Sequence, residues 1–174
     1  TPTSGILYDL GAHIIDQAID LFGTPATILG KTYIERPNSV ISDAFDVLLD
    51  YTGGPSVFLH ASLLALEPLP RYVVYGTEGS FIKYGIDIQE DQLKEGVSPL
   101  AVHFGEESPE FQGLVSVWQE GKKVSYRLPT EKGNWMALFD SLAEAIQGVS
   151  SYKITDNELF VQGKIYDILQ KRSS

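Results

Sequence analysis

The sequence predicts an α+β domain in which an open, mostly antiparallel β-sheet carries helices on one face. Three observations lead to this prediction. An amphipathic helix pattern opens the chain, a long middle section alternates β-branched and aromatic residues with turn residues, and two helix patterns close the chain. Strands that follow one another through short turns pair antiparallel, so the middle section predicts a sheet.

The opening helix is predicted from Leu7 to Phe22. Three- and four-residue spacing joins its apolar stripe, which consists of Leu7, Leu10, Ile14, Ala18 and Leu21. Gly23 follows directly and predicts a C-cap, because glycine readily adopts the backbone conformation that ends a helix.

The middle section predicts seven strands after Pro25. They cover residues 26–35, 44–51, 56–64, 72–75, 80–84, 114–119 and 122–128. Turn residues at 52–55, 76–79 and 120–121 connect neighbouring strands as hairpins. Residues 86–112 are rich in Glu, Gly, Pro and Asp, and predict a long surface excursion that carries Asp87, Gln89 and His103.

Two helices are predicted at the end of the chain. The stripe of the first consists of Trp135, Leu138, Phe139, Leu142 and Ile146. The second begins at Thr155, whose partner Glu158 completes a capping box, and runs to about Arg172. We therefore expect a single domain over residues 1–174.

Composition narrows the classes of function. The chain has no cysteine, which excludes disulfides, thiolate nucleophiles and cysteine-bound metals. A formal net charge of −10 disfavours nucleic acid and anionic membranes as partners. No apolar run approaches the ~20 residues that span a bilayer, and residues 1–5 lack the features of a secretory signal. We expect a cytoplasmic protein.

The chemistry-bearing residues of the first helix are Asp9 and His13, which lie one turn apart. Asp16 and Asp20 continue the same polar stripe. A carboxylate near an imidazole can orient the ring and favour its protonated form, as a general base requires. A solvated helix face with one histidine explains the pattern too, and a metal site of Asp9, His13 and Asp16 is a further alternative.

The other two histidines and the loops of the chain give weaker indications of a functional site. His60 lies in a strand pattern and is interpreted as a satisfied sheet residue, while His103 is interpreted as a surface-loop residue. The sequence has neither a Gly-x-Gly-x-x-Gly loop nor a Walker-type phosphate loop. The chain therefore does not bind a nucleotide phosphate in these familiar ways.

Residues 4–16, with the sequence SGILYDLGAHIID, resemble a signature of the Gfo/Idh/MocA family, named for glucose–fructose oxidoreductase, inositol dehydrogenase and MocA. The ending Leu-Phe-Gly-Thr-Pro at 21–25 is also typical of that family. Residues 75–81 resemble its strand, Gly-Thr-x-Gly turn and strand. The resemblance extends over essentially the whole chain.

The resemblance implies the C-terminal domain of such an oxidoreductase, which acts on a sugar or polyol. In complete members an N-terminal Rossmann domain binds NAD or NADP and supplies a lysine from a Glu-Lys-Pro motif; this chain contains neither. By resemblance, His13 is the general acid/base and Asp9 binds a substrate hydroxyl or steadies His13. Asp16 has a structural role, through capping or pairing, and Tyr8 lines the pocket.

The same resemblance implies that this chain alone is inactive, and that its open sheet face forms a homo-oligomer. A second hypothesis is a non-catalytic sheet module for oligomerisation or partner binding, suggested by the alternation in Val47–Tyr51 and Val57–Ser62. A third is a metal-dependent isomerase or hydrolase that uses His13 and the nearby carboxylates.

Overall fold

A computed structural model describes residues 4–172 of the chain, with side chains through Gln170. Residues 1–3, which the sequence analysis searched for a secretory signal, lie outside the described residues. The contacts divide the chain into two compact units. Unit 1 comprises residues 1–66 and 152–174, and unit 2 comprises residues 67–151.

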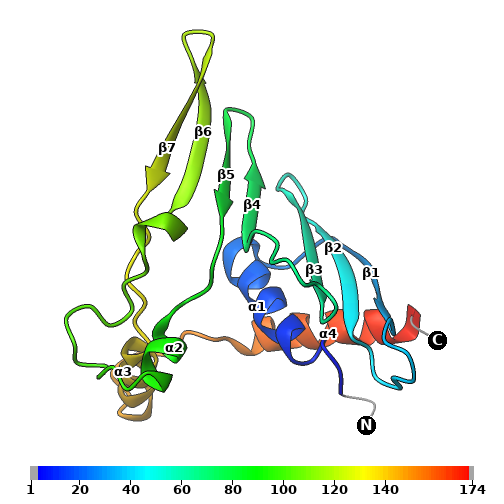
Figure 1. The fold of residues 1–174 in the computed structure, drawn as a ribbon. Helices are drawn as coiled ribbons and strands as arrows, with labels where there is room; N and C mark the ends of the chain where they lie inside the picture. Colours follow the sequence, from blue (N-terminus) through cyan, green and yellow to red (C-terminus); the bar gives the residue numbers. More distant parts are fainter. Residues whose placement is uncertain (1–3, 173–174) are drawn as a thin grey trace. The chain divides into compact units, whose positions relative to one another are not determined.

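Unit 1 is a three-stranded sheet covered by two helices. Its elements are α1 (Leu10–Phe22), β1 (Thr27–Tyr33), β2 (Ala44–Asp50), β3 (Ser56–Ser62) and α4 (Asp156–Arg172). The strands pair antiparallel in the order β1-β2-β3, in a register that aligns Leu29, Leu48 and Phe58. Both helices lie on the same face of this sheet (Figure 1).

The core of unit 1 lies between that face and the helices. Phe45, Val47 and Leu49 alternate along β2 and are fully buried, as the two-residue period of a strand requires. Ile165 and Leu169 of α4 pack in the same cluster. Gly30 of β1 permits this close approach, because a Cβ at that position would lie 2.8 Å from Leu169 Cδ2.

The buried stripe of α1 differs from the prediction. Of the predicted stripe, Leu7 and Ala18 are buried, but Leu10 and Leu21 are 44% and 64% exposed. Gly11, Ile15 and Ile19 are buried instead. The helix has two apolar stripes, and the one that includes Gly11 packs against the core. Gly11 lies close to Phe45, because a Cβ added there would be 3.3 Å from Phe45 Cε1. The helix also begins at Leu10 instead of Leu7, because hydrogen-bonded turns occupy residues 5–9.

Unit 2 is a four-stranded sheet with short helical segments. Its elements are β4 (Tyr72–Tyr75), β5 (Gly79–Lys83), α2 (Gln89–Lys94), the 3₁₀ turn Pro109–Phe111, β6 (Gly113–Gln119), β7 (Lys122–Leu128) and α3 (Met136–Ile146). The strands pair antiparallel in the order β4-β5-β6-β7. Within this unit, α2 and α3 lie at the opposite end from the turn between β6 and β7 (Figure 1).

The predicted surface excursion is more ordered than expected. It contains α2 and the 3₁₀ turn, and Gln89 is only 1% exposed. The Gln89 side chain donates to Asp87 Oδ2 (2.7 Å) and accepts from the Trp135 backbone N–H (3.0 Å). These bonds tie the excursion to the start of α3. The six residues of α2 were too few to produce a recognisable helical period.

The predicted α+β class is confirmed, since every strand pair is antiparallel and helices cover one face of the sheet in unit 1. The seven strands form two hydrogen-bonded sheets, of three and four strands. The capping box is confirmed as well: Glu158 accepts from the Thr155 backbone N–H at 2.6 Å. Across residues 4–172, every helix is too short or too polar to cross a membrane.

Candidate functional site

The predicted motif is fixed at its start to the connection between β1 and β2. The Ile6 backbone N–H donates to Ser42 O at 3.1 Å. Gly5 has a φ of 114° in the left-handed region, and a Cβ there would lie 2.6 Å from Ser42 Oγ. Glycine is therefore required at this position. Because Gly5 lies against Ser42, Asp9, four residues later, lies beside the connection between β1 and β2.

Asp9 and His13 are both exposed, Asp9 at the N-cap position of α1 and His13 one turn further on. Within residues 4–172, neither side chain has a hydrogen-bond or ion-pair partner, and the two do not bond to each other. The direct support of the imidazole by the carboxylate is therefore not formed here. Both groups are free to contact a ligand.

The rest of the polar stripe is also exposed, as predicted. Asp20 lies 3.6 Å from Lys153 Nζ. Asp16 has neither an ion pair nor a capping bond among the described residues, so it lacks the structural role that the resemblance implied. It instead adds negative charge near Tyr166, where burial and the charges of Tyr8 and Asp16 raise the pKa of the phenol.

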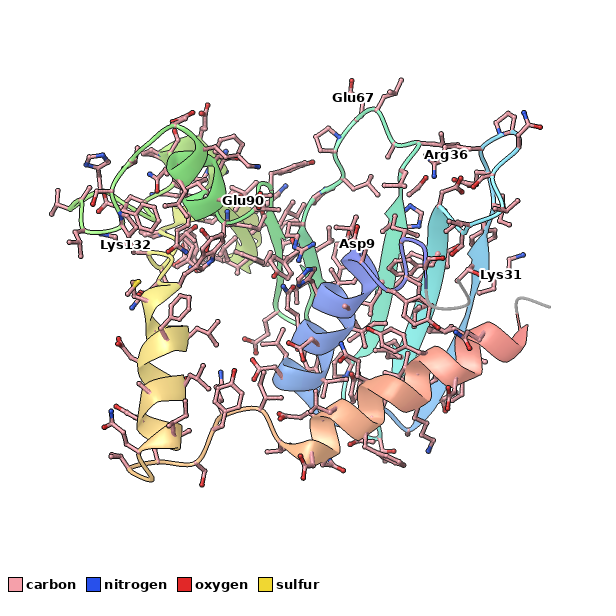
Figure 2. The ribbon with its side chains drawn as sticks, turned by 90° about the horizontal axis from the view of Figure 1, so that it is seen from below. Asp9, Lys31, Arg36, Glu67, Glu90 and Lys132 are labelled. Carbon is pink, nitrogen blue, oxygen red and sulfur yellow. The ribbon has the colours of Figure 1, made fainter. Side chains whose placement is uncertain are left out.

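Asp9 lines an open cavity of about 470 Å³ in unit 1, and His13 is not among the residues that line it. The polar lining side chains are Asp9, Arg36, Asn38, Ser39 and Ser42, all but Asp9 from the β1–β2 connection. Ile6, Val40, Ile41 and Leu63 add apolar surface. Figure 2 labels Asp9 at the start of α1 and Arg36 at the end of the sheet. These loop residues were not predicted, because they follow no hydrophobic periodicity and belong to no recognised motif.

Asp43 holds this connection in place. Its carboxylate is fully buried and accepts from the Glu35 N–H (2.7 Å), the Arg36 N–H (3.1 Å) and Arg36 Nε (2.9 Å). The Glu35 hydrogen bond, opposed by burial and reinforced by Arg36, lowers the pKa of Asp43. The ionised carboxylate thus fixes both the backbone and the guanidinium of Arg36 beside the cavity.

Tyr8 lies elsewhere. Its ring packs against Tyr166 of α4, with centroids 5.0 Å apart, and its hydroxyl accepts a hydrogen bond from Gln170. Burial, and then the charge of Asp167, raise the pKa of Tyr8, which keeps its hydroxyl protonated. Tyr8 is not among the residues that line the cavity, and its contact with substrate stays a prediction.

His60 behaves as a satisfied sheet residue. Its Nδ1 lies 2.7 Å from Asp46 Oδ1 on the open face of the β1–β2–β3 sheet, and the Tyr33 hydroxyl donates to Asp46 Oδ2 at 2.7 Å. Burial acts to raise the pKa of Asp46, but the hydrogen bonds from His60 and Tyr33 outweigh it, and the pKa is lowered. His103 is exposed in a turn of unit 2.

Two kinds of site find no support in the described part of the chain. No group of three or more His, Cys, Asp or Glu side chains in residues 4–172 is placed to hold a metal ion, which disfavours the alternative of Asp9, His13 and Asp16 as ligands. All strand pairs there are antiparallel, so these residues contain no parallel βαβ unit of the dinucleotide-binding kind.

Comparison with known proteins decides the family. The family model described as the GFO/IDH/MocA C-terminal domain matches residues 1–82. Over 155 residues, 89% of this chain, the sequence is 36% identical to scyllo-inositol 2-dehydrogenase (NADP(+)) IolW of Bacillus subtilis (strain 168). The chain belongs to the Gfo/Idh/MocA family. The resemblance found in the motif of residues 4–16 is thereby confirmed.

Further relatives of this Gfo/Idh/MocA chain are also named oxidoreductases. The uncharacterized oxidoreductase YdgJ of Escherichia coli (strain K12) is 35% identical over 84% of the chain and 42% of its own length. The crystal structure of an oxidoreductase from Bacillus cereus matches with a TM-score of 0.89 and 29% identity, over 100% of this chain and 51% of that one. The match to IolW covers 43% of IolW, so the chain spans about half the length of its relatives.

Proposed function

We propose that this chain is the substrate-binding and catalytic half of an NAD(P)-dependent oxidoreductase that moves hydride between a sugar or polyol hydroxyl and nicotinamide. The observation that carries the proposal is the exposed, unpartnered pair Asp9 and His13, with Asp9 in the wall of a cavity. Every curated relative is named an oxidoreductase or a dehydrogenase, which agrees with it.

His13 would act as the general base. As the substrate carbon is oxidised, its hydroxyl must lose a proton, or positive charge would build up on the oxygen. An unpaired imidazole ring nitrogen can accept that proton and return it in the reverse reaction. Such proton transfer contributes about 10²- to 10⁴-fold to a rate.

Asp9 would bind an adjacent hydroxyl. A carboxylate accepts hydrogen bonds only, so it suits a polyol, whose hydroxyls are donors. Asp9 is the N-cap residue of α1, and His13 follows it in the first turns of that helix. The proposed arrangement places one hydroxyl of the substrate on Asp9 and another, which is deprotonated, on His13.

The cofactor would be bound mainly by a Rossmann domain outside this chain, because the described strands are all antiparallel. When bound there, nicotinamide supplies the hydride acceptor. The name of IolW specifies scyllo-inositol and NADP(+), which makes this pair the first to test. We further propose that the complete protein works in the cytoplasm.

The experiment compares this chain with the complete protein that contains it. We expect no saturable NADH or NADPH binding by residues 1–174 alone, and oxidation of scyllo-inositol by the complete protein with NADP⁺. His13→Ala should lower kcat/KM about 10²- to 10⁴-fold, while His103→Ala, in the exposed turn of unit 2, should leave it unchanged. Undiminished activity of His13→Ala would refute the role of His13.

A second candidate function is self-association through the open face of the β1–β2–β3 sheet. Leu29, Leu48 and Phe58 form a cross-strand row on that face, and Leu29 and Phe58 are exposed. Exposed apolar side chains in a row can pack against the same row of a second copy. Light scattering tests it with Phe58→Ser, which should shift the protein to smaller species. Oligomers without oxidoreductase activity in the complete protein would favour this candidate alone.

A further inference from the structure

The cavity beside Asp9 contains two opposite charges that do not neutralise each other. Asp9 and Arg36 both line it, yet no ion pair within 4.0 Å joins them among the described residues. The volume, about 470 Å³, falls in the range of roughly 300–1,000 Å³ that is typical of small-molecule sites. A ligand in this cavity can therefore contact both the carboxylate and the guanidinium.

Arg36 is held in one orientation. Asp43 is fully buried and binds Arg36 through Nε at 2.9 Å, and through the Arg36 backbone N–H at 3.1 Å. The two terminal Nη groups have no partner among residues 4–172, and the side chain is 47% exposed. A guanidinium fixed at Nε presents its remaining donors in a planar fork. Arg36 is thus preorganised as a hydrogen-bond donor at the cavity wall.

The charges around the cavity favour a neutral ligand. Asp43 already compensates the charge of Arg36, and Asp9 adds a second carboxylate, so these three groups together carry one net negative charge. The whole chain carries −10. The carboxylate of Asp9 would repel a carboxylate or phosphate on the substrate, whereas hydroxyl groups can both donate to Asp9 and accept from Arg36.

We infer that Arg36 is a specificity-determining residue of the proposed site, and that its Nη groups bind the hydroxyl groups of a neutral polyol while the carboxylate of Asp9 disfavours an acidic sugar. Its Nη groups donate to hydroxyl oxygens on the part of the polyol away from His13, while Asp9 accepts from a hydroxyl near the reacting carbon. This inference rests on the proposed function. Asn38 and Ser39, from the same connection, add polar groups to the wall that holds the polyol.

The test uses the complete protein with scyllo-inositol as the neutral probe and D-glucuronate as the acidic one. Arg36→Gln removes the donor fork and should raise KM for scyllo-inositol about 10- to 100-fold, because a hydrogen bond to a charged group is lost in substrate and transition state alike. kcat should change by less than about threefold. Lys122→Gln, the same charge change on exposed β7, should leave both constants unchanged.

Ligand-detected NMR with scyllo-inositol, without cofactor, supplies a readout independent of turnover. Wild-type protein should give binding signals that Arg36→Gln loses and Lys122→Gln keeps. Arg36→Lys, which retains the charge but not the fork, should lie between wild type and Arg36→Gln. If Arg36→Gln fails to fold, Arg36→Lys carries the test, with KM raised about 3- to 10-fold.

Three results would overturn the inference: an unchanged KM in the Arg36 variants, no NMR signal for scyllo-inositol with wild-type protein, or tighter binding of D-glucuronate than of scyllo-inositol. None of these depends on His13. Conversely, a fully active His13→Ala protein with a raised KM in Arg36→Gln would refute the catalytic proposal and leave the assignment of Arg36 in place.

Discussion

The two units of the chain differ in how many of their apolar side chains are buried. Of the buried apolar residues in the described part of the chain, Phe104 alone belongs to unit 2, and all others belong to unit 1. Every residue of β7 is exposed, and α3 has no buried residue. Unit 1 therefore has a hydrophobic core of its own, whereas unit 2 offers apolar surface that this chain leaves open.

The difference matches the placement of the candidate site. The motif, the cavity and Asp43 all lie in unit 1, where a packed core can hold side chains in fixed positions. Unit 2 is organised by polar contacts instead. Lys83 Nζ bonds to Glu107 Oε2 (2.6 Å), Tyr84 O and Phe111 O, and Gln89 ties Asp87 to the start of α3.

The largest effect is expected in the core of unit 1. Ile15→Ala removes a fully buried side chain of α1 and should destabilise the protein by about 2–5 kcal/mol. Leu21→Ala, on the exposed side of the same helix, should cost less than about 0.5 kcal/mol. Urea unfolding of both variants measures the contrast. Equal losses would mean that α1 does not pack on the face we describe.

A smaller effect is expected from the polar anchor of unit 2. Lys83→Met removes the donor to Glu107 Oε2 and to two carbonyl groups, while Glu107 Oε1 keeps its bond from Thr130, and the change should cost about 1–3 kcal/mol. Lys94→Met breaks the exposed pair with Glu90 and should cost less than about 1 kcal/mol. Hydrogen exchange of β5 and β6 in the two variants provides the measurement. Faster exchange in Lys94→Met than in Lys83→Met would contradict this account.

The pH dependence of stability tests the anchor of the cavity. Asp43 has a folded pKa below its ordinary value of 3.8, so its contribution is present above the unfolded pKa and is lost as the pH falls through the folded pKa. Asp43→Asn should therefore lower the Tm at neutral pH, and the difference from wild type should shrink in acid. Asp140→Asn, on exposed α3, should follow wild type throughout. A Tm difference between Asp43→Asn and wild type that grew as the pH fell would contradict a stabilising role of the ionised Asp43 carboxylate.

The smallest effect on stability is expected on α3. Phe139→Ala truncates a side chain that is 60% exposed and should change the free energy of unfolding by less than about 0.5 kcal/mol. If the open surface of unit 2 serves association, the same variant should self-associate less. Sedimentation velocity reports that change, and an unfolding cost comparable to that of Ile15→Ala would show instead that unit 2 has a core.

Local sequence signals predicted much of the fold. Gly53 and Gly54, like Gly121, mark hairpin turns, so the strand bounds follow to within a few residues. The capping box at Thr155 marked the start of α4 to within one residue. These signals depend on neighbours in the chain, which is why sequence alone reveals them.

Features set by tertiary contacts were missed. The buried stripe of α1 is chosen by the approach of Gly11 to Phe45, which no spacing rule contains. Arg36 reaches the cavity only because Asp43 folds the β1–β2 connection back on itself. The motif itself was found from its residues. The cavity that Asp9 and Arg36 line together is a property of the folded chain, so it could not be predicted.

The central claim is that one exposed histidine of unit 1 performs proton transfer while another is structural. The most direct measurement compares His13→Gln with His60→Gln in the complete protein, following scyllo-inositol oxidation with NADP⁺. The account predicts a loss of about 10²- to 10⁴-fold in kcat/KM for His13→Gln and near wild-type activity for His60→Gln, whose partner is Asp46. Equal activity of the two variants would contradict it.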